Sequence, residues 1–409
     1  MLQHKIIDME KGPWKGENWW VSQFNFEKEV LDTLELPSKV LIHDSTLRDG
    51  EQAAGVIFTK DQKVEIAKML DNAGVQIIEA GFPAVSPADQ EAIRAVCNAD
   101  LNAKITCLCR AMEKDIDLAK KCGVSGAIIE VPVSYPRLKY QFEWREEDVI
   151  EKALRVVSYA KESGLEAHLF LIDSTRARME FLESLVTRAV KEAGSDKVTV
   201  VDTNGCINPP GIKYLVKKIK SWVNVPIEMH CHNDFGLGVA NSLAGVENGA
   251  ESISCTLNAL GQRAGNSSTE EVAFALECLY GVKTGIDFYK LYEVSQLVKR
   301  LSGWSFPPNK PITGDNLFTW EAGIPTAALM KNPHTVEPFQ PEIFGRKHEI
   351  KLGKKSGKAN IHWKLRELGL TLPEERIEKV LEDIKQKAIT FERALTDEEF
   401  IKIIEENSK

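Results

Sequence analysis

Two short stretches of this sequence carry side chains that are suited to bind a metal ion. His230 and His232 are separated by one residue, and Asp49 lies in a run dense in charge between residues 44 and 52. Alternate residues of a β-strand point to one face, so the two histidines would share a face. Two imidazoles and a carboxylate can hold a divalent metal ion. The simpler alternatives are two histidines satisfied by hydrogen bonds and a solvated turn with one Arg–Asp pair.

The run that contains Asp49 directly follows a short β-type segment, Val40–Ile42. Charged groups so dense are not needed to hold a core, because a buried charge is costly unless it is paired or bound to a metal. The C-terminal ends of parallel strands are where α/β enzymes keep their catalytic groups. The position of this run after a strand therefore predicts an active site.

The segments that would position these residues alternate between apolar runs and amphipathic helices from Val40 to about Leu279. Strands are expected near 40–44, 76–80, 104–108, 126–131, 166–172, 197–202, 226–231 and 252–256. Their nearly continuous Val, Ile and Leu content is typical of strands covered on both faces. Eight strand–helix repeats predict an α/β fold, a (β/α)8 TIM barrel. A doubly wound sheet is the alternative, but the Gly-rich phosphate turn that usually follows its first strand is missing.

The chain outside the barrel divides by composition. We expect an N-terminal arm over 1–38, a TIM-barrel catalytic domain over 39–284, a linker subdomain over 285–370 and mostly helical C-terminal segments over 371–409. The arm holds Trp14, Trp19 and Trp20, which need a surface to bury against, either the main body or a partner subunit. In the last segment, apolar residues from Ile377 to Ile384 recur with a helical period.

Composition narrows the class of protein. The 409 residues have a net charge of −8 and no basic block, which argues against nucleic acid as a partner. No apolar run approaches the roughly 20 residues that a membrane span needs, and no secretory signal is evident. The eight cysteines include no CxxC pair. They are therefore expected to be reduced thiols of a cytoplasmic protein.

Further polar residues lie at the predicted strand ends, where they would share one barrel mouth with Asp49. They are Glu79, Arg110, Ser134, Arg137 and Thr203. Such a set suits a small polyanionic substrate chelated by the metal. Asn266, in a Gly-bearing loop after the last strand, would supply a neutral oxygen as a fourth ligand. Alternatively, the glycines of that loop only permit a tight turn.

Four segments in this order resemble the isopropylmalate/homocitrate/citramalate synthase family. They are Ser45–Gln52 (STLRDGEQ), Glu79–Pro83 (EAGFP), His230–Gly236 (HCHNDFG) and Gly261–Asn266 (GQRAGN). That family belongs with hydroxymethylglutaryl-CoA lyase to the DRE-TIM metallolyases. The resemblance extends over about residues 38–370 and includes Leu352–Gly357 of the linker.

The resemblance implies a Claisen-type condensation of a 2-oxo acid with acetyl-CoA that yields a 2-hydroxy diacid. The implied ligands of the divalent ion (Zn, Mn, Mg or Co) are Asp49, His230, His232 and Asn266. Arg48 would stabilise the ketone oxygen as it becomes negatively charged. The side chains implied to lie nearest the oxo acid are those of Gln52, Thr203 and Arg137. A homodimer is the family's expected assembly.

Three departures from the family pattern concern the activation of acetyl-CoA. Asp173 stands where the family has a glutamate that supports the base, Pro325 replaces a histidine and Val336 replaces a tyrosine. Proline and valine cannot move protons, and His334 is either a substitute or a loop histidine. Two alternatives to the synthase therefore stay open: a lyase that runs retro-Claisen or retro-aldol chemistry, and a degenerate barrel that only binds.

Overall fold

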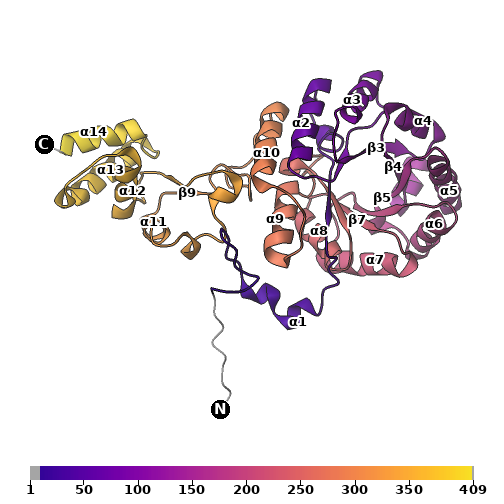
Figure 1. Ribbon diagram of the computed structural model, residues 1–409, viewed down its shortest axis with the longest axis horizontal. Coiled ribbons are helices and arrows are strands. Elements are labelled where there is room, and N and C mark those ends of the chain that lie inside the picture. The colour runs from indigo at the N-terminus through magenta and orange to yellow at the C-terminus, as the bar shows by residue number, and fades with distance from the viewer. Residues whose placement is uncertain (1–9, 408–409) are drawn as a thin grey trace, which may run out of the picture. The chain divides into compact units, whose positions relative to one another are not determined.

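The computed structural model describes residues 10–407 (Figure 1). It divides into two compact units. One comprises Phe24–Phe306, and the other comprises the described residues up to Gln23 together with those from Pro307 onward. Residues 1–9 of the predicted arm and residues 408–409 of the predicted C-terminal segment lie outside the described residues.

The first unit is a closed barrel of eight parallel strands, which confirms the predicted TIM barrel. The strands are β1 Leu41–Asp44, β2 Ile77–Glu79, β3 Lys104–Arg110, β4 Gly126–Pro132, β5 Glu166–Ile172, β6 Lys197–Asp202, β7 Ile227–Cys231 and β8 Ser252–Cys255. Neighbours in sequence are neighbours in the barrel, and β8 closes it by pairing in parallel with β1, where Cys255 is in register with Asp44.

Helices surround the barrel in the ring that Figure 1 shows. They are α2 Lys60–Asn72, α3 Pro87–Cys97, α4 Glu113–Cys122, α5 Glu146–Glu162, α6 Met179–Lys191, α7 Pro209–Trp222, α8 Gly238–Val246 and α9 Thr269–Tyr280. Local sequence sets several of their starts. Thr59 and Gln62 form a capping box at α2, and the Ser86 side chain caps α3, which begins with proline.

The compact unit extends to Phe306, beyond the boundary at residue 284 that the sequence suggested. The reason is α10 (Phe288–Ser302), whose Leu291, Val294 and Val298 are buried in the barrel's hydrophobic core. At the other end, the unit begins at Phe24 and includes the short helix α1 (Lys28–Leu31).

The barrel interior is layered, because every second residue of a strand faces the axis. The layer near the N-terminal ends of the strands is polar, and the Glu228 carboxylate is at its centre. This carboxylate accepts hydrogen bonds from Lys197 (2.9 Å), Thr199 (3.1 Å) and Ser252 (2.9 Å), and it lies 3.1 Å from Nδ1 of His43. Closer to the C-terminal ends of the strands, Leu108, Ile128, Phe170 and Val201 form an apolar cluster.

The second unit contains β9 Thr319–Trp320, β10 Glu349–Ile350, α11 Gly323–Leu329, α12 Lys358–Leu368, α13 Ile377–Phe391 and α14 Asp397–Asn407. Its core includes the predicted stripe of α13, in which Ile377, Val380, Leu381 and Ile384 are all buried. Of the described arm, residues 10–23 belong to this unit. The Trp20 amide donates to the Pro338 carbonyl (2.8 Å), and Trp19 forms a β-bridge with Phe339.

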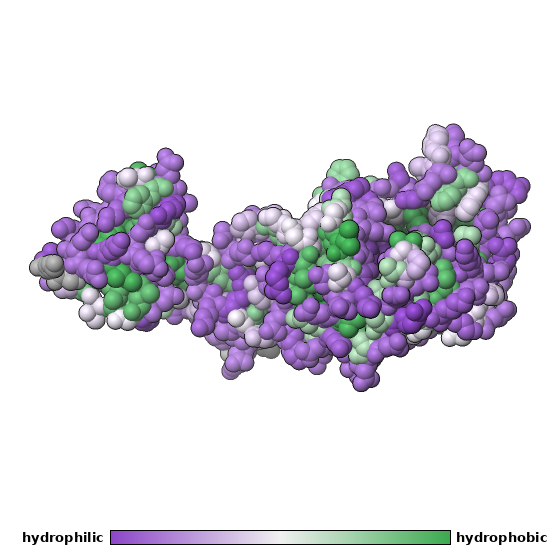
Figure 2. All heavy atoms as spheres, turned by 90° about the horizontal axis from the view of Figure 1, so that it is seen from above, coloured by the Kyte–Doolittle hydropathy of each residue, from purple (hydrophilic) through white to green (hydrophobic). Residues whose placement is uncertain are grey.

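The face of the molecule drawn in Figure 2 is mainly hydrophilic, with scattered hydrophobic residues between charged ones. No helix within residues 10–407 is long and apolar enough to cross a membrane.

Candidate metal centre and active site

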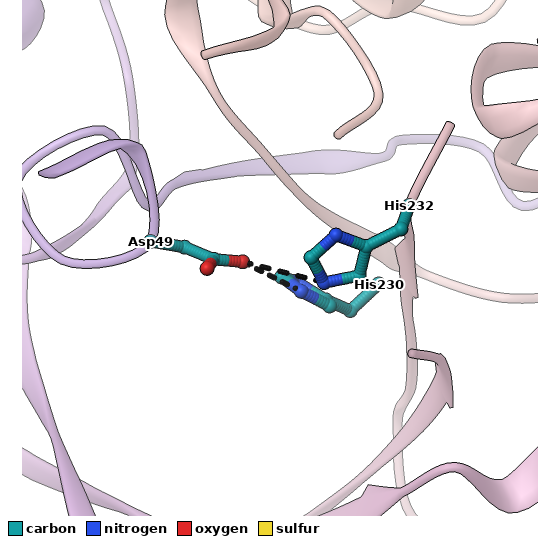
Figure 3. A group of neighbouring side chains, drawn as sticks. All are labelled: Asp49, His230 and His232. Atoms are coloured by element: carbon teal, nitrogen blue, oxygen red, sulfur yellow. Dashed lines mark ion pairs between the residues drawn. The ribbon is translucent and has the colours of Figure 1, made fainter. Parts of the chain in front are cut away.

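Asp49, His230 and His232 meet at the C-terminal end of the barrel, as Figure 3 shows. Oδ2 of Asp49 lies 3.0 Å from Nε2 of His230 and 3.7 Å from Nε2 of His232. The ligand atoms of the three side chains lie within 4.8 Å of one another, and all three residues are buried. Within the described residues, no other group of three or more His, Cys, Asp or Glu side chains has this geometry.

The charges of these side chains suit a cation. Burial alone would raise the pKa of Asp49, but the neighbouring Arg48 guanidinium and the two imidazoles hold it well below its usual value. Burial lowers the pKa of His232 to about 4, and the Asp49 charge opposes this only in part. At neutral pH, Asp49 is therefore ionised and His232 is neutral, which are the states in which these groups bind metals.

Neighbouring polar groups orient the ligands. Oγ of Ser254, on β8, lies 2.9 Å from Nδ1 of His230, so Nε2 of this ring faces Asp49. The Asn266 amide nitrogen donates to Oδ2 of Asp49 at 2.7 Å. The other amide atom of Asn266, Oδ1, is buried and has no partner within the described residues. A carboxylate, two imidazoles and a partnerless amide oxygen fit a divalent ion, and the predicted role of Asn266 as fourth ligand stays a prediction.

Arg48 lies beside this centre in a fixed orientation. Its Nε donates to Oε1 of Glu79 at 2.6 Å, and its Nη1 lies 3.3 Å from Oδ1 of Asp49. Ser45 donates to the other oxygen of Glu79. The guanidinium lies over the ring of Phe170 at 5.8 Å, and its Nη2 is buried without a partner in the described part of the chain. A buried cation therefore presents a free N–H group in the barrel mouth.

The loop that carries Arg48 and Asp49 is held by its own backbone and by α2. The Ser45 carbonyl accepts the amide protons of Arg48, Asp49 and Gly50. Nζ of the fully buried Lys63 donates to the Leu47 carbonyl at 3.1 Å. Lys63 was not predicted from the sequence, although a charged residue on the apolar stripe of α2 was a signal.

The residues predicted to bind substrate lie at the C-terminal strand ends but have local partners. Oγ1 of Thr203 accepts the Asp173 amide (2.8 Å), and Oε1 of Gln52 accepts from Gln262 (3.2 Å). The Ser134 hydroxyl is buried and accepts the Arg137 amide at 3.4 Å. The side chain of Arg110 binds Asp115, and that of Arg137 donates to Gln141. Their role in binding substrate stays a prediction.

Asp173 adopts a left-handed backbone conformation (φ 64°) and is fully buried. Arg176 donates to both oxygens of its carboxylate, at 2.9 and 2.6 Å, and Asn204 donates to it at 3.3 Å. This carboxylate is therefore bound to its neighbours on all sides. Pro325, Val336 and His334 lie in the second unit, where Nε2 of His334 is 3.0 Å from Nε2 of Gln340.

A cavity of about 280 Å³ lies beside Arg48. Gln52, Ile57, Phe82 and Val85 contribute to its lining. It therefore has the mixed apolar and polar character that small-molecule sites have.

The comparison with known proteins agrees with this geometry. The family model described as HMGL-like matches residues 39–298, which is more than half of the chain. The chain belongs to the HMGL-like family. A second model, the homocitrate synthase post-HMGL domain-like family, matches residues 312–391 of this HMGL-like protein.

Two relatives of this HMGL-like protein are named as synthases. It is 44% identical over 363 residues to homocitrate synthase AksA of Methanopyrus kandleri. That match covers 89% of this chain and 91% of that protein. It is 45% identical over 343 residues to 2-isopropylmalate synthase of Methanocaldococcus jannaschii. That match covers 84% of this chain and 66% of that protein. These similarities confirm the resemblance to the synthases.

Among solved structures, the HMG-CoA lyase of Bacillus subtilis is similar to this HMGL-like protein, with a TM-score of 0.60. The match covers 66% of this chain and 96% of the lyase at 21% sequence identity. At that identity, the similarity supports the barrel fold alone, and it gives the lyase activity no advantage over the synthase activity.

Proposed function

We propose that this protein condenses a 2-oxo acid with acetyl-CoA in a reaction that requires a divalent metal ion and releases CoA and a 2-hydroxy diacid. One observation carries the proposal: a buried ligand set of Asp49, His230 and His232 adjoins Arg48, which has a free N–H group. The 44% identity to a protein named homocitrate synthase, over 89% of this chain, favours the synthase over the lyase.

The residues have distinct roles in this proposal. When bound by Asp49, His230 and His232, the metal supplies a Lewis acid that polarises the ketone of the 2-oxo acid. Arg48 donates to the same oxygen as negative charge develops on it. Glu79 orients Arg48 through the 2.6 Å hydrogen bond to its Nε.

Around the substrate, the candidate binding groups stay those predicted from the sequence. They are Gln52, Arg110, Ser134, Arg137 and Thr203. The apolar cluster that contains Phe170 would face the side chain of the oxo acid, because the Phe170 ring packs against the ring of His230. Specificity for one oxo acid depends on the volume left there.

The test measures CoA release with a thiol reagent. The purified protein is given Mn²⁺, acetyl-CoA and a panel of 2-oxo acids of increasing side-chain length, with and without a distal carboxylate. Release that depends on an oxo acid, is lost in His232→Ala and is kept in His362→Ala supports the proposal. His362 is a matched control, because it is a histidine outside the proposed ligand set, and its Nε2 lies 3.7 Å from Glu374.

Absence of release with every oxo acid, in protein that binds the metal, would contradict the proposal. The lyase alternative would then be tested by supplying 2-hydroxy diacids and 3-hydroxyacyl-CoA thioesters and measuring their cleavage.

The proposal includes a cytoplasmic homodimer. The eight cysteines are all free thiols, which suits a reducing compartment. Light scattering coupled to size exclusion tests the assembly, and a monomer at micromolar concentration would contradict it. Cell fractionation with an antibody against the protein tests the compartment.

A further inference from the structure

The proposed reaction needs a base that removes a proton from the acyl-CoA methyl group, and the structure contains an unassigned carboxylate at the barrel mouth. Glu130 lies near the C-terminal end of β4. It is in register with Arg110 on β3 and with Phe170 on β5. Residues in register on parallel strands share a face.

The direction of the Glu130 side chain follows from Phe170. The Phe170 ring lies inside the barrel, because it packs 5.2 Å from the ring of the metal ligand His230 and 5.8 Å from the guanidinium of Arg48. Ile128, two residues before Glu130 on the same strand, belongs to the interior apolar cluster. Glu130 therefore points into the barrel, one step closer to the mouth than Ile128.

Glu130 differs from the other acidic side chains near the mouth in having no hydrogen bond or ion pair with any described residue. The other carboxylates are held by basic, amide or hydroxyl groups. They are Asp49, Glu51, Glu79, Asp173, Asp202 and Asp234. A base must have an oxygen free to accept a proton, so Glu130 has the property that they lack.

The electrostatic surroundings of Glu130 suit the same role. Burial raises its pKa, and the nearby charges of Arg48, Arg137 and Arg110 oppose that shift without cancelling it. A carboxylate whose pKa is raised is a stronger base than one with the ordinary pKa. The charge of Arg48 lowers the pKa of Glu130, and Arg48 also lies beside the metal ligand Asp49. The proposed base and the ketone site are therefore both close to this guanidinium.

We propose that Glu130 is the base that enolises the acyl-CoA in this protein. This inference rests on the proposed function. A Glu130 oxygen takes a proton from the acyl methyl, and the C–H electron pair forms the enolate. The enolate carbon then bonds to the ketone carbon of the 2-oxo acid. The ketone oxygen takes up the proton that Glu130 holds, and water cleaves the thioester into CoA thiol, a carboxylate and a proton.

The experiment follows exchange of the acyl methyl protons in D2O by mass spectrometry, which reports enolisation without condensation. Acetyl-CoA is incubated with the Mg²⁺-loaded protein and a 2-hydroxy acid that occupies the oxo-acid position without a ketone. Wild type is compared with Glu130→Gln, Glu130→Asp and Glu166→Gln. Glu166 is the matched control, because it is a glutamate at the opposite end of a barrel strand, where it pairs with Lys104.

We expect exchange to fall at least 100-fold in Glu130→Gln, the range for loss of a general base. Glu130→Asp should retain part of the rate, and Glu166→Gln should match wild type. The acid limb of kcat/KM against pH should also disappear in Glu130→Gln, while the metal content stays unchanged. Wild-type exchange in Glu130→Gln, or a change confined to the KM of the oxo acid, would overturn the assignment.

The inference and the proposed function fail separately. If proton exchange depends on Glu130 but no oxo acid causes CoA release, Glu130 is still the base for enolisation. The proposed condensation would then be contradicted. Release that survives unchanged in Glu130→Gln would confirm the condensation and overturn the base. If wild type shows neither exchange nor release, both proposals are wrong.

Discussion

The hydroxyl oxygen of Ser254 lies 2.9 Å from Nδ1 of His230, on the strand next to it in the barrel. This contact sets which ring nitrogen of His230 faces Asp49. Groups that orient a metal-binding histidine in this way typically change metal affinity 10- to 100-fold when they are removed.

We therefore expect Ser254→Ala to weaken binding of a divalent ion about 10- to 100-fold, measured by competition with a chelating dye. Ser252→Ala is the matched control, because Ser252 lies on the same strand but binds Glu228 in the polar layer. Equal loss of affinity in both variants would show that the effect is not specific to His230.

Arg48→Lys should lower kcat by about 10²- to 10³-fold, as loss of one donor to a developing oxyanion does. Lysine keeps the charge but cannot donate to Glu79 and also keep a planar N–H group free for substrate. Steady-state kinetics of CoA release measure this. Arg145→Lys, on an exposed arginine paired with Asp148, should leave kcat unchanged. A wild-type kcat in Arg48→Lys would exclude Arg48 as the donor.

Lys63→Met should destabilise the protein by about 3 kcal/mol, because removing one partner of a buried ion pair leaves the other uncompensated. Nζ of Lys63 lies 2.5 Å from Glu51 as well as binding the Leu47 carbonyl. The double variant Lys63→Met/Glu51→Gln should recover part of this loss, since it removes both charges. Urea unfolding measures both, and equal stability of the single and double variants would contradict the pairing.

The stability of the barrel should depend on the ionisation of Asp44. Burial raises the pKa of this carboxyl to about 6. The protonated Asp44 carboxyl therefore stabilises the fold fully below the pKa that this carboxyl has in the unfolded protein. This stabilisation is lost as the pH rises through about 6. Relative to Asp44→Asn, wild type should lose about 2 kcal/mol between pH 4 and pH 7.

Urea unfolding across this pH range provides the measurement for Asp44. Asp61→Asn, at an exposed position in the first turn of α2, is the control and should differ from wild type by a constant amount. A constant difference for Asp44→Asn as well would show that folding does not raise the pKa of the Asp44 carboxyl.

Local sequence was sufficient to predict the barrel, because each strand–helix repeat carries its own apolar run and cap signals. It also placed Asp49 and His230 at one mouth, since both follow or end parallel strands. Ser254 and Glu130 escaped prediction for a physical reason. Their significance depends on the register between strands, which pairs Ser254 with His230 and Glu130 with Phe170. Nothing in the sequence near either residue specifies that pairing.

The groups that would activate the acyl-CoA could be placed from the sequence only by motif position, and their roles stay predictions. Asp173 was selected by its position in a motif, but the backbone turn at φ 64° brings Arg176 against its carboxylate. A three-residue spacing in the sequence does not reveal a left-handed turn.

The apolar cluster of Leu108, Ile128, Phe170 and Val201 lies closer to the mouth than the Glu228 network. The barrel interior thus has a buried ionic layer near the N-terminal ends of its strands and a metal-binding mouth at their C-terminal ends. Natural variation or protein engineering can change the charges of this ionic layer to adjust thermal stability without altering the metal ligands.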